Sequence, residues 1–234
     1  MEKRIYSIEQ VAKFLNLTEK KVQKLAEHGE LEGQKIQGKW TFSKADLLVW
    51  FEKAMSDTEN AEHLVRMEDF AEHHVPQEEP QMVSLSELLV PEAVLFPFTA
   101  KTKDSVIRQM AARGAQLGKV WDPDRLADAL RFREEMMSTA MENGVAILHP
   151  RRPMPDNTAD SFVLLGVALR GIPFGGGYNN LTDTFFLVCA MDDKTHLHLL
   201  ASIARMLNRP GFLDRLRELE SAREIADWVR ENES

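Results

Sequence analysis

Apolar residues recur at helical spacing in two short stretches near the start of the 234-residue chain. The first stretch follows Ser7 and Gln10, which form the capping-box pattern of a helix start. The second stretch follows Thr18, a residue type that caps helices. Its inward-facing positions are Val22, Leu25 and Ala26. Two short helices joined through LNLT predict a helix-turn-helix.

Two short extended pieces follow, in GELEGQKIQGKWTF, and Gly33 and Gly38 separate them. Ser43 and Asp46 then form a capping box at the start of SKADLLVWFEKAM, a third helical stretch. The order helix, helix, hairpin, helix predicts a small winged helix-turn-helix domain over residues 1–55.

The pattern breaks over residues 56–83, which are acidic, contain two prolines near their end and lack a sustained buried face. We interpret this segment as a linker. Its middle, residues 61–74, has helix-forming composition, and we expect a solvated helix there.

Beyond the linker, extended apolar pieces alternate with helical ones. The extended pieces are AVLFPF, GVAIL, FVLLGVAL and TFFLVCA. Helices are expected over residues 104–117, from a cap at Asp124 through Ser138, and over EIADWVR behind a cap formed by Ser221 and Glu224. This alternation predicts an α/β domain over residues 84–234, with a mixed sheet flanked by helices.

The net charge of −8 argues against nucleic-acid binding until it is divided along the chain. Residues 1–55 carry +2, residues 56–83 carry −7 and residues 84–234 carry −3. Only the first segment can approach nucleic-acid phosphates, and its surplus of positive charge is small.

The first segment resembles the excisionase and MerR-like family of DNA-binding domains over nearly all of residues 4–53. The resemblance implies that the second helix enters the major groove and that the hairpin wing touches the DNA backbone or minor groove. The DNA-binding candidates are Lys20, Lys21, Gln23, Lys24, Lys35 and Lys39. Trp40 is expected in the core. Glu27, Glu30 and Glu32 leave open that this head binds protein instead of DNA.

His149 follows the strand-like VAIL and precedes Pro150, and a loop at a strand end is a usual place for a functional side chain. Imidazole suits reversible phosphoryl transfer because one ring nitrogen can attack phosphorus while the other holds a proton. The candidate donors to phosphoryl oxygens are Arg133, Ser138, Thr139, Arg151 and Arg152. The residues alone leave open that His149 is a hydrogen-bonded structural histidine.

The stretch RFREEMMSTAMENGVAILHP resembles the phosphorylation-site motif R-E-x-L-G-S-T-G-I-G-N-G-I-A-I-P-H of phosphotransferase-system enzyme IIA domains, in the mannitol, fructose and nitrogen-regulatory branch. The resemblance covers about residues 84–231. It implies that His149 accepts a phosphoryl group from the phosphocarrier HPr or its nitrogen-branch relative, usually on Nε2, and that Arg133 helps to neutralise it. It further implies that His196, in HLHLLASIA, is a second histidine of the site.

The motif departs from the family pattern next to the histidine. Leu148 stands where the pattern has proline, Ala140 and Glu142 replace two glycines, and PRRP follows the site. If those glycines let the backbone approach phosphate, their loss and the charge of Glu142 weaken the acceptor.

Three further features receive structural interpretations. Gly175, Gly176 and Gly177 lack the Gly-Lys-Ser/Thr of a phosphate loop and are expected in a flexible surface loop. Cys189, in the apolar run FFLVCA, is expected to pack as a small hydrophobe. The histidines at positions 73, 74, 196 and 198 lack the cysteine or carboxylate spacing of a metal site, and we expect neither a metal nor a cofactor.

Together the two segments predict a phosphorylation-responsive transcription regulator. Its expected partners are HPr or the nitrogen-branch relative, DNA, and a second copy of the chain. No apolar run approaches the ~20 residues that cross a bilayer, so we expect a cytoplasmic protein without a membrane span.

Two alternative functions stay open. The missing glycines suggest an IIA-like interaction or ligand-sensing protein that has lost phosphorylation. A phosphotransferase relay component that carries phosphohistidine would need a IIB partner bearing a cysteine or histidine acceptor.

Overall fold

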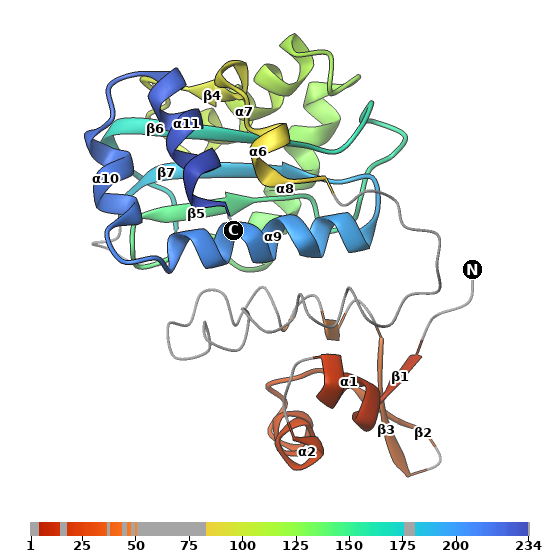
Figure 1. The fold of residues 1–234 in the computed structure, drawn as a ribbon. Coiled ribbons are helices and arrows are strands. Elements are labelled where there is room, and N and C mark those ends of the chain that lie inside the picture. The colour runs from red at the N-terminus through yellow and green to blue at the C-terminus, as the bar shows by residue number, and fades with distance from the viewer. Residues whose placement is uncertain are drawn as a thin grey trace. The chain divides into compact units, whose positions relative to one another are not determined.

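A computed structural model describes residues 5–14, 18–36, 38–43, 46–47, 50, 83–175 and 181–233. Its contacts divide the chain into two units, Met1–Glu78 and Glu79–Ser234 (Figure 1). Apart from Val83, the expected linker and its helix over residues 61–74 lie outside the described residues, as does most of the third helix expected after Ser43.

The first unit contains a three-stranded antiparallel sheet and two helices. The strands, in the sheet order β1-β3-β2, are β1 (Ile5–Ser7), β2 (Gln34–Ile36) and β3 (Lys39–Ser43), and the helices are α1 (Ile8–Phe14) and α2 (Glu19–Glu27). The Oγ of Ser7 accepts from the Gln10 amide at 3.3 Å, and the Oγ1 of Thr18 accepts from the Lys21 amide at 3.3 Å. The predicted caps and the predicted helix-turn-helix with its hairpin are therefore confirmed.

The core of the first unit forms beneath α2. The predicted inner face of that helix is buried, and Leu31 and Phe42 are fully buried. A Cβ added at Gly33 would lie 2.6 Å from the ring of Phe42, so a side chain at this position would displace the ring from the core. Trp40, predicted in the core, is half-buried and stacks on Phe42 with ring centroids 6.3 Å apart.

The second unit is the mixed α/β domain that the alternating pattern predicts. Its strands are β4 (Val94–Leu95), β5 (Val145–Leu148), β6 (Phe162–Pro173) and β7 (Leu181–Cys189). Its helices are α6 (Leu85–Leu88), the 3-10 turn η1 (Pro91–Ala93), α7 (Lys103–Gln116), α8 (Pro123–Met136), α9 (Asp193–Leu207), α10 (Phe212–Glu218) and α11 (Ala222–Asn232). The sheet order is β4-β6-β7-β5, in which β6 and β7 are antiparallel and both edge strands are parallel to their neighbours.

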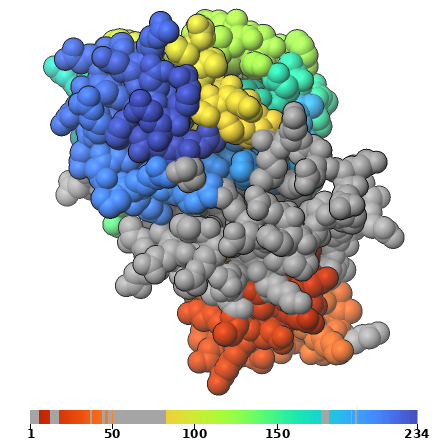
Figure 2. Space-filling view, viewed as in Figure 1, coloured from red at the N-terminus to blue at the C-terminus, as the bar shows by residue number. Residues whose placement is uncertain are grey.

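Helices cover both faces of this sheet. Alternate residues of β7, including Phe185 and Leu187, join the core with α7 and α8, because successive side chains of a strand point to opposite faces. Helices α9, α10 and α11 lie on the other face, and with α6 they form much of the surface visible in Figure 2. The sheet is therefore buried on both sides, and its strand ends are the places where side chains can reach other molecules.

Helix α8 begins and ends differently from the prediction. Its cap is Asp122, whose side chain accepts from the Arg125 amide at 3.0 Å, whereas Asp124 lies in the first turn. The expectation of a cap at Asp124 was therefore wrong, because Pro123 occupies the first helical position, where its fixed φ suits a helix start. The helix stops at Met136, before Ser138. The cap of α11 is Ser221, as predicted.

Among the described helices, none combines the length and the apolar character that a membrane crossing requires.

Candidate functional site

His149 lies directly after the carboxyl end of β5 and is 2% exposed. Its Nδ1 is 2.9 Å from the carbonyl oxygen of Ile147. A carbonyl oxygen only accepts hydrogen bonds, so this contact places the proton of the neutral ring on Nδ1 and the lone pair on Nε2. The backbone thereby fixes which ring nitrogen is nucleophilic.

Arg133 reaches the nucleophilic nitrogen from α8. Its Nε donates to His149 Nε2 at 3.3 Å, and its Nη1 donates to the carbonyl oxygen of Met137 at 2.8 Å. Arg133 is 4% exposed, and the planar fork of its guanidinium suits the oxygens of a phosphoryl group. One arm of Arg133 is thus anchored to the backbone while another addresses the histidine.

His196 brings a second imidazole to the same place from α9. Its ring centroid is 5.1 Å from that of His149, the two rings meet edge to face at 60°, and His196 is 5% exposed. Three predicted site residues from three different elements therefore converge: Arg133, His149 and His196.

The predicted phosphate donors Ser138 and Thr139 direct their hydroxyls to a buried carboxylate. Ser138 Oγ donates to Glu134 Oε1 at 2.6 Å, and Thr139 donates to Glu134 Oε2 through its amide at 3.0 Å and its hydroxyl at 2.7 Å. Both residues thus hold the loop after α8. The motif contains Glu134, but sequence reasoning gave it no role, since a motif match does not state which groups bond to one another.

The chain after β6 lies against Ser138. A Cβ added at Gly175 would lie 1.7 Å from Ser138 Oγ, so only glycine allows this approach. Gly175 therefore belongs to a packed contact, which differs from the flexible loop expected over positions 175–177. Residues 176 and 177 lie outside the described residues.

The replaced glycines of the motif lie beside β5. Ala140 forms an isolated antiparallel bridge with Ala146, and Glu142 is exposed in the turn that precedes β5. His149 follows the other end of this strand, which spans roughly 13 Å at the usual rise per residue. The strand thus separates the carboxylate of Glu142 from the imidazole of His149.

Arg151 and Arg152 are exposed in the loop after His149. Among the described residues, neither makes a hydrogen bond or ion pair. The structure therefore gives them no polar contact with His149, although both are close to it in sequence.

The DNA-binding candidates line the outer surface of the first unit. Those on α2 are Lys20, Lys21, Gln23 and Lys24, and all four are exposed. Gln23 Nε2 donates to Glu27 Oε1 at 2.8 Å. On the hairpin, Lys35 and Lys39 are exposed, and Lys35 Nζ lies 4.9 Å from the centroid of the Trp40 ring.

Two further candidate chemistries concern Cys189 and a metal site. Burial raises the pKa of the Cys189 thiol well above its ordinary value, so the thiol stays protonated and is a poor nucleophile. Among residues that the structure describes, no three metal-ligating side chains converge; His73 and His74 lie outside them.

Two family models match the chain. Residues 87–232 match the family described as phosphoenolpyruvate-dependent sugar phosphotransferase system, EIIA 2, and residues 5–55 match a helix-turn-helix domain. These matches confirm the resemblances drawn from the two sequence motifs.

Curated proteins show the same likeness. The nitrogen regulatory protein of Bradyrhizobium diazoefficiens is 29% identical over 143 residues, which are 60% of this chain and 91% of that protein. The mannitol-specific phosphotransferase enzyme IIA component of Staphylococcus aureus is 28% identical over 147 residues, 63% of this chain and 98% of that protein. The fructose-specific EIIABC component of Bacillus subtilis is 26% identical, and the match spans only 24% of its length.

Solved structures agree in fold. The mannitol IIA protein of Escherichia coli has a TM-score of 0.53 at 20% identity, and covers 59% of this chain and 96% of its own. The nitrogen regulatory protein IIA of Neisseria meningitidis has a TM-score of 0.55 at 16% identity, and covers 62% of this chain and 97% of its own. At these identities the likeness shows the fold of the second unit.

Proposed function

The chain belongs to the phosphoenolpyruvate-dependent sugar phosphotransferase system EIIA 2 family, and from that premise we propose a phosphorylation-responsive transcription regulator whose acceptor is His149. The observation that carries the proposal is the buried contact between Arg133 Nε and His149 Nε2 at 3.3 Å. It joins a nucleophilic nitrogen of fixed tautomer to a permanent cation.

The transfer follows from this geometry. His149 Nε2 attacks the phosphorus of a phosphohistidine on the donor protein, and the N–P bond to His149 forms as the donor N–P bond breaks. The proton on Nδ1 remains in its bond to Ile147. The Nε–H of Arg133 turns from the ring nitrogen to the phosphoryl oxygens, where it offsets charge that builds up in a site shielded from water.

The other predicted site residues have supporting roles in the proposal. His196, whose ring meets that of His149 edge to face, donates to a phosphoryl oxygen. Ser138 and Thr139 contribute indirectly, by holding the loop after α8. Arg151 is exposed beside the site and supplies positive charge to the incoming phosphoryl group.

The first unit supplies the regulatory output. Residues 1–55 bind DNA, with α2 in the major groove and the β2–β3 hairpin on the backbone, and the exposed cationic candidates of both elements contact phosphates or bases. Residues 56–83 join this head to the acceptor domain over residues 84–234. HPr or its nitrogen-branch relative is the proposed donor, and a second copy of the chain would provide a second head.

Incubation with phosphoenolpyruvate, enzyme I and a phosphocarrier, followed by intact mass measurement, tests the acceptor. We expect the mass of one added phosphoryl group, and none on His149→Ala. His28→Ala is the matched control, because it removes an exposed histidine of the first unit and should leave labelling unchanged. Labelling of His149→Ala at the unaltered level would contradict the assignment.

DNA affinity of the phosphorylated and unmodified chains tests the regulatory output. Phosphorylation adds charge of about −2, and a typical coupling free energy of ~1–3 kcal/mol would change DNA affinity by several-fold to about a hundredfold. Both forms are measured on the same DNA at the same salt, with His149→Ala as the form that cannot respond. Equal affinities would leave a DNA-binding head and a phosphoacceptor with separate functions.

A second candidate function is an interaction or ligand-sensing protein without phosphoryl transfer, favoured by Ala140 and Glu142 in place of glycines. Absence of labelling on a folded chain would support it. A relay to a IIB protein is the third candidate; one solved relative is the Escherichia coli enzyme IIA of mannitol in complex with phosphorylated enzyme IIB. Loss of label from the phosphorylated chain to a IIB protein would support the relay.

A further inference from the structure

We propose that Lys103 is a positioning residue for phosphoryl acceptance, acting on Arg133 through the buried carboxylate of Glu134. The inference rests on the proposed role of His149. Lys103 is the first residue of α7, outside the stretch that carries the phosphorylation motif, and it touches neither histidine in the contacts described.

Glu134 is the centre of the arrangement. Its side chain is 3% exposed and accepts hydrogen bonds from Ser138 and Thr139. Among the described residues, its cationic partner is Lys103, whose Nζ lies 3.1 Å from Glu134 Oε1. A buried carboxylate needs both hydrogen bonds and an opposite charge, because transfer from water into a protein interior is costly.

The loop that Glu134 holds also carries an anchor of Arg133. Met137 lies between the end of α8 and the two residues bonded to Glu134, and its carbonyl oxygen accepts from Arg133 Nη1 at 2.8 Å. Movement of Ser138 and Thr139 would therefore move this oxygen. A guanidinium that loses its anchor no longer presents Nε to His149 in a fixed direction, and displacement by ~1 Å can cost ~100-fold in rate.

Lys103 also lies near the chain segment that follows β6. Its Nζ lies 5.3 Å from the centroid of the Phe174 ring, and the neighbouring Gly175 packs on Ser138. The ammonium thus pairs with Glu134 on α8 and lies over the aromatic ring at the end of β6. Its side chain is 39% exposed, so it can be replaced without opening the core.

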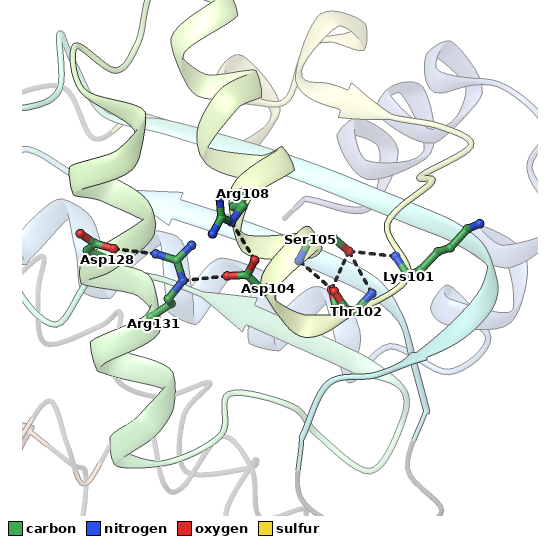
Figure 3. Close-up of polar contacts among 7 residues, drawn as sticks. All are labelled: Lys101, Thr102, Asp104, Ser105, Arg108, Asp128 and Arg131. Carbon is green, nitrogen blue, oxygen red and sulfur yellow. Dashed lines mark hydrogen bonds and ion pairs between the residues drawn. The ribbon is translucent and has the colours of Figure 1, made fainter.

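The next residue of α7 provides a matched control. Asp104 accepts from Arg131 Nε at 2.8 Å and from Arg108 Nε at 2.7 Å, and Arg131 Nη1 donates to Asp128 at 2.6 Å (Figure 3). This network joins the same two helices as Lys103 and Glu134, and among the described residues it makes no hydrogen bond or ion pair with the loop after α8. A variant that breaks this network therefore shows how much the packing of α7 on α8 in general affects labelling, apart from the contacts that position Arg133.

The first experiment compares initial labelling rates of the full chain in the phosphocarrier assay. We expect Lys103→Met to slow labelling by about 10- to 100-fold, as loss of a supporting contact typically does. Lys103→Arg should recover most of the rate, because it restores the cation. Asp104→Asn and the exposed Lys101→Met should stay within about twofold of the unaltered chain. Equal rates for Lys103→Met and the unaltered chain would overturn the inference.

A double-mutant cycle shows whether Lys103 acts through Arg133. In the Arg133→Leu background, Lys103→Met should cause little further loss, since the group that it positions is already gone. A full additional loss would show that Lys103 affects folding or donor binding by another route, and would overturn the inference.

A second measurement does not depend on phosphoryl transfer. The Arg133 Nε–H resonance, assigned with Arg133→Lys, should shift and exchange faster with solvent in Lys103→Met than in Lys101→Met. Lys103→Gln replaces Lys103→Met if the latter lowers the folded fraction seen by circular dichroism. An unchanged resonance overturns the positioning role even if no phosphocarrier labels the chain, whereas absent labelling with a shifted resonance contradicts only the proposed function.

Discussion

The two functional regions of this protein differ in how their side chains are held. At the proposed acceptor site, Arg133, His149 and His196 are each no more than 5% exposed, and hydrogen bonds or ring contacts fix their directions. On α2 of the first unit, the DNA-binding candidates project into solvent, and the described contact of Gln23 is with a neighbour on its own helix.

The difference shows which proposed function has its side chains already in place before a partner binds. The proposed transfer to His149 needs groups set in place before the donor arrives, and the arrangement is present in the unmodified protein. The proposed recognition of DNA by α2 needs cations that remain hydrated until phosphates displace the water and counterions. Substitutions in the buried site should therefore have large individual effects, and those on α2 should have smaller, cumulative ones.

Apart from loss of the acceptor itself, the largest effect is expected from Arg133→Leu, which removes the cation beside Nε2 while keeping much of the side-chain volume. Labelling should slow by about 100-fold or more, because preorganised charge is among the strongest contributions to transfer. The measurement is the initial rate of mass gain in the phosphocarrier assay. Arg151→Leu is the matched variant in the exposed loop. Its fold-decrease in labelling rate should be at least ten times smaller than that of Arg133→Leu. A larger loss of rate in Arg151→Leu than in Arg133→Leu would contradict the expectation that buried site residues have the larger effects on labelling.

His196→Ala should have the next largest effect, slowing labelling by roughly tenfold to a hundredfold while some final labelling remains, because the nucleophile and Arg133 are still present. Rate and end point are followed separately. His198→Ala, two residues further along α9, is the comparison and should retain more activity. Complete loss in His196→Ala, equal to that in His149→Ala, would make His196 as necessary as the acceptor.

Charge reversal on α2 should act more moderately. Lys21→Glu with Lys24→Glu should weaken duplex DNA binding by roughly tenfold or more and lower the salt slope by about two, since each lysine that neutralises a phosphate contributes about one. Fluorescence anisotropy over a salt series measures both. The exposed pair Lys101→Glu with Arg170→Glu makes the same change of net charge in the second unit. Equal losses in the two pairs would indicate nonspecific attraction.

The smallest effect concerns acid stability. Hydrogen bonding from Arg131 lowers the pKa of Asp104 in the folded protein below its ordinary value. Its contribution to stability is therefore fully present above the unfolded pKa of about 4 and is lost as pH falls through the folded pKa. Asp104→Asn should make unfolding in urea slightly less sensitive to acid below about pH 4. The exposed Asp124→Asn should not; a response of the same size would indicate a general effect of net charge.

Sequence predicted the parts of this molecule that depend on close neighbours or on a shared motif. Caps at Ser7, Thr18 and Ser221 join residues three apart, so a local pattern contains both partners. His149, Arg133 and His196 converge as the family resemblance implies. Local reasoning placed the cap of α8 at Asp124, whereas the structure has it at Asp122, before Pro123.

Contacts between residues that are distant in sequence could not be predicted from local sequence patterns. The bond from Lys103 to Glu134 joins two helices, and nothing in the composition of α7 distinguishes Lys103 from its neighbours. The close approach of Gly175 to Ser138 depends on how the chain returns after β6. The role of Ser138 and Thr139 also depends on tertiary structure, because their hydroxyls could equally have faced a phosphoryl group.

The end of α11 has a consequence for the order of events during synthesis. Glu233 directly follows α11, and its carboxylate accepts from the backbone amides of Leu85 and Ser86. These bonds add to the capping box that Ser84 and Glu87 form at the start of α6, and α11 also contacts β4 and η1. During synthesis, Leu85 and Ser86 are made at the beginning of the second unit and Glu233 at its end. The segment from α6 to β4 therefore gains its contacts with α11 only after the rest of the second unit has been synthesised, although α6 has its own capping box from the start.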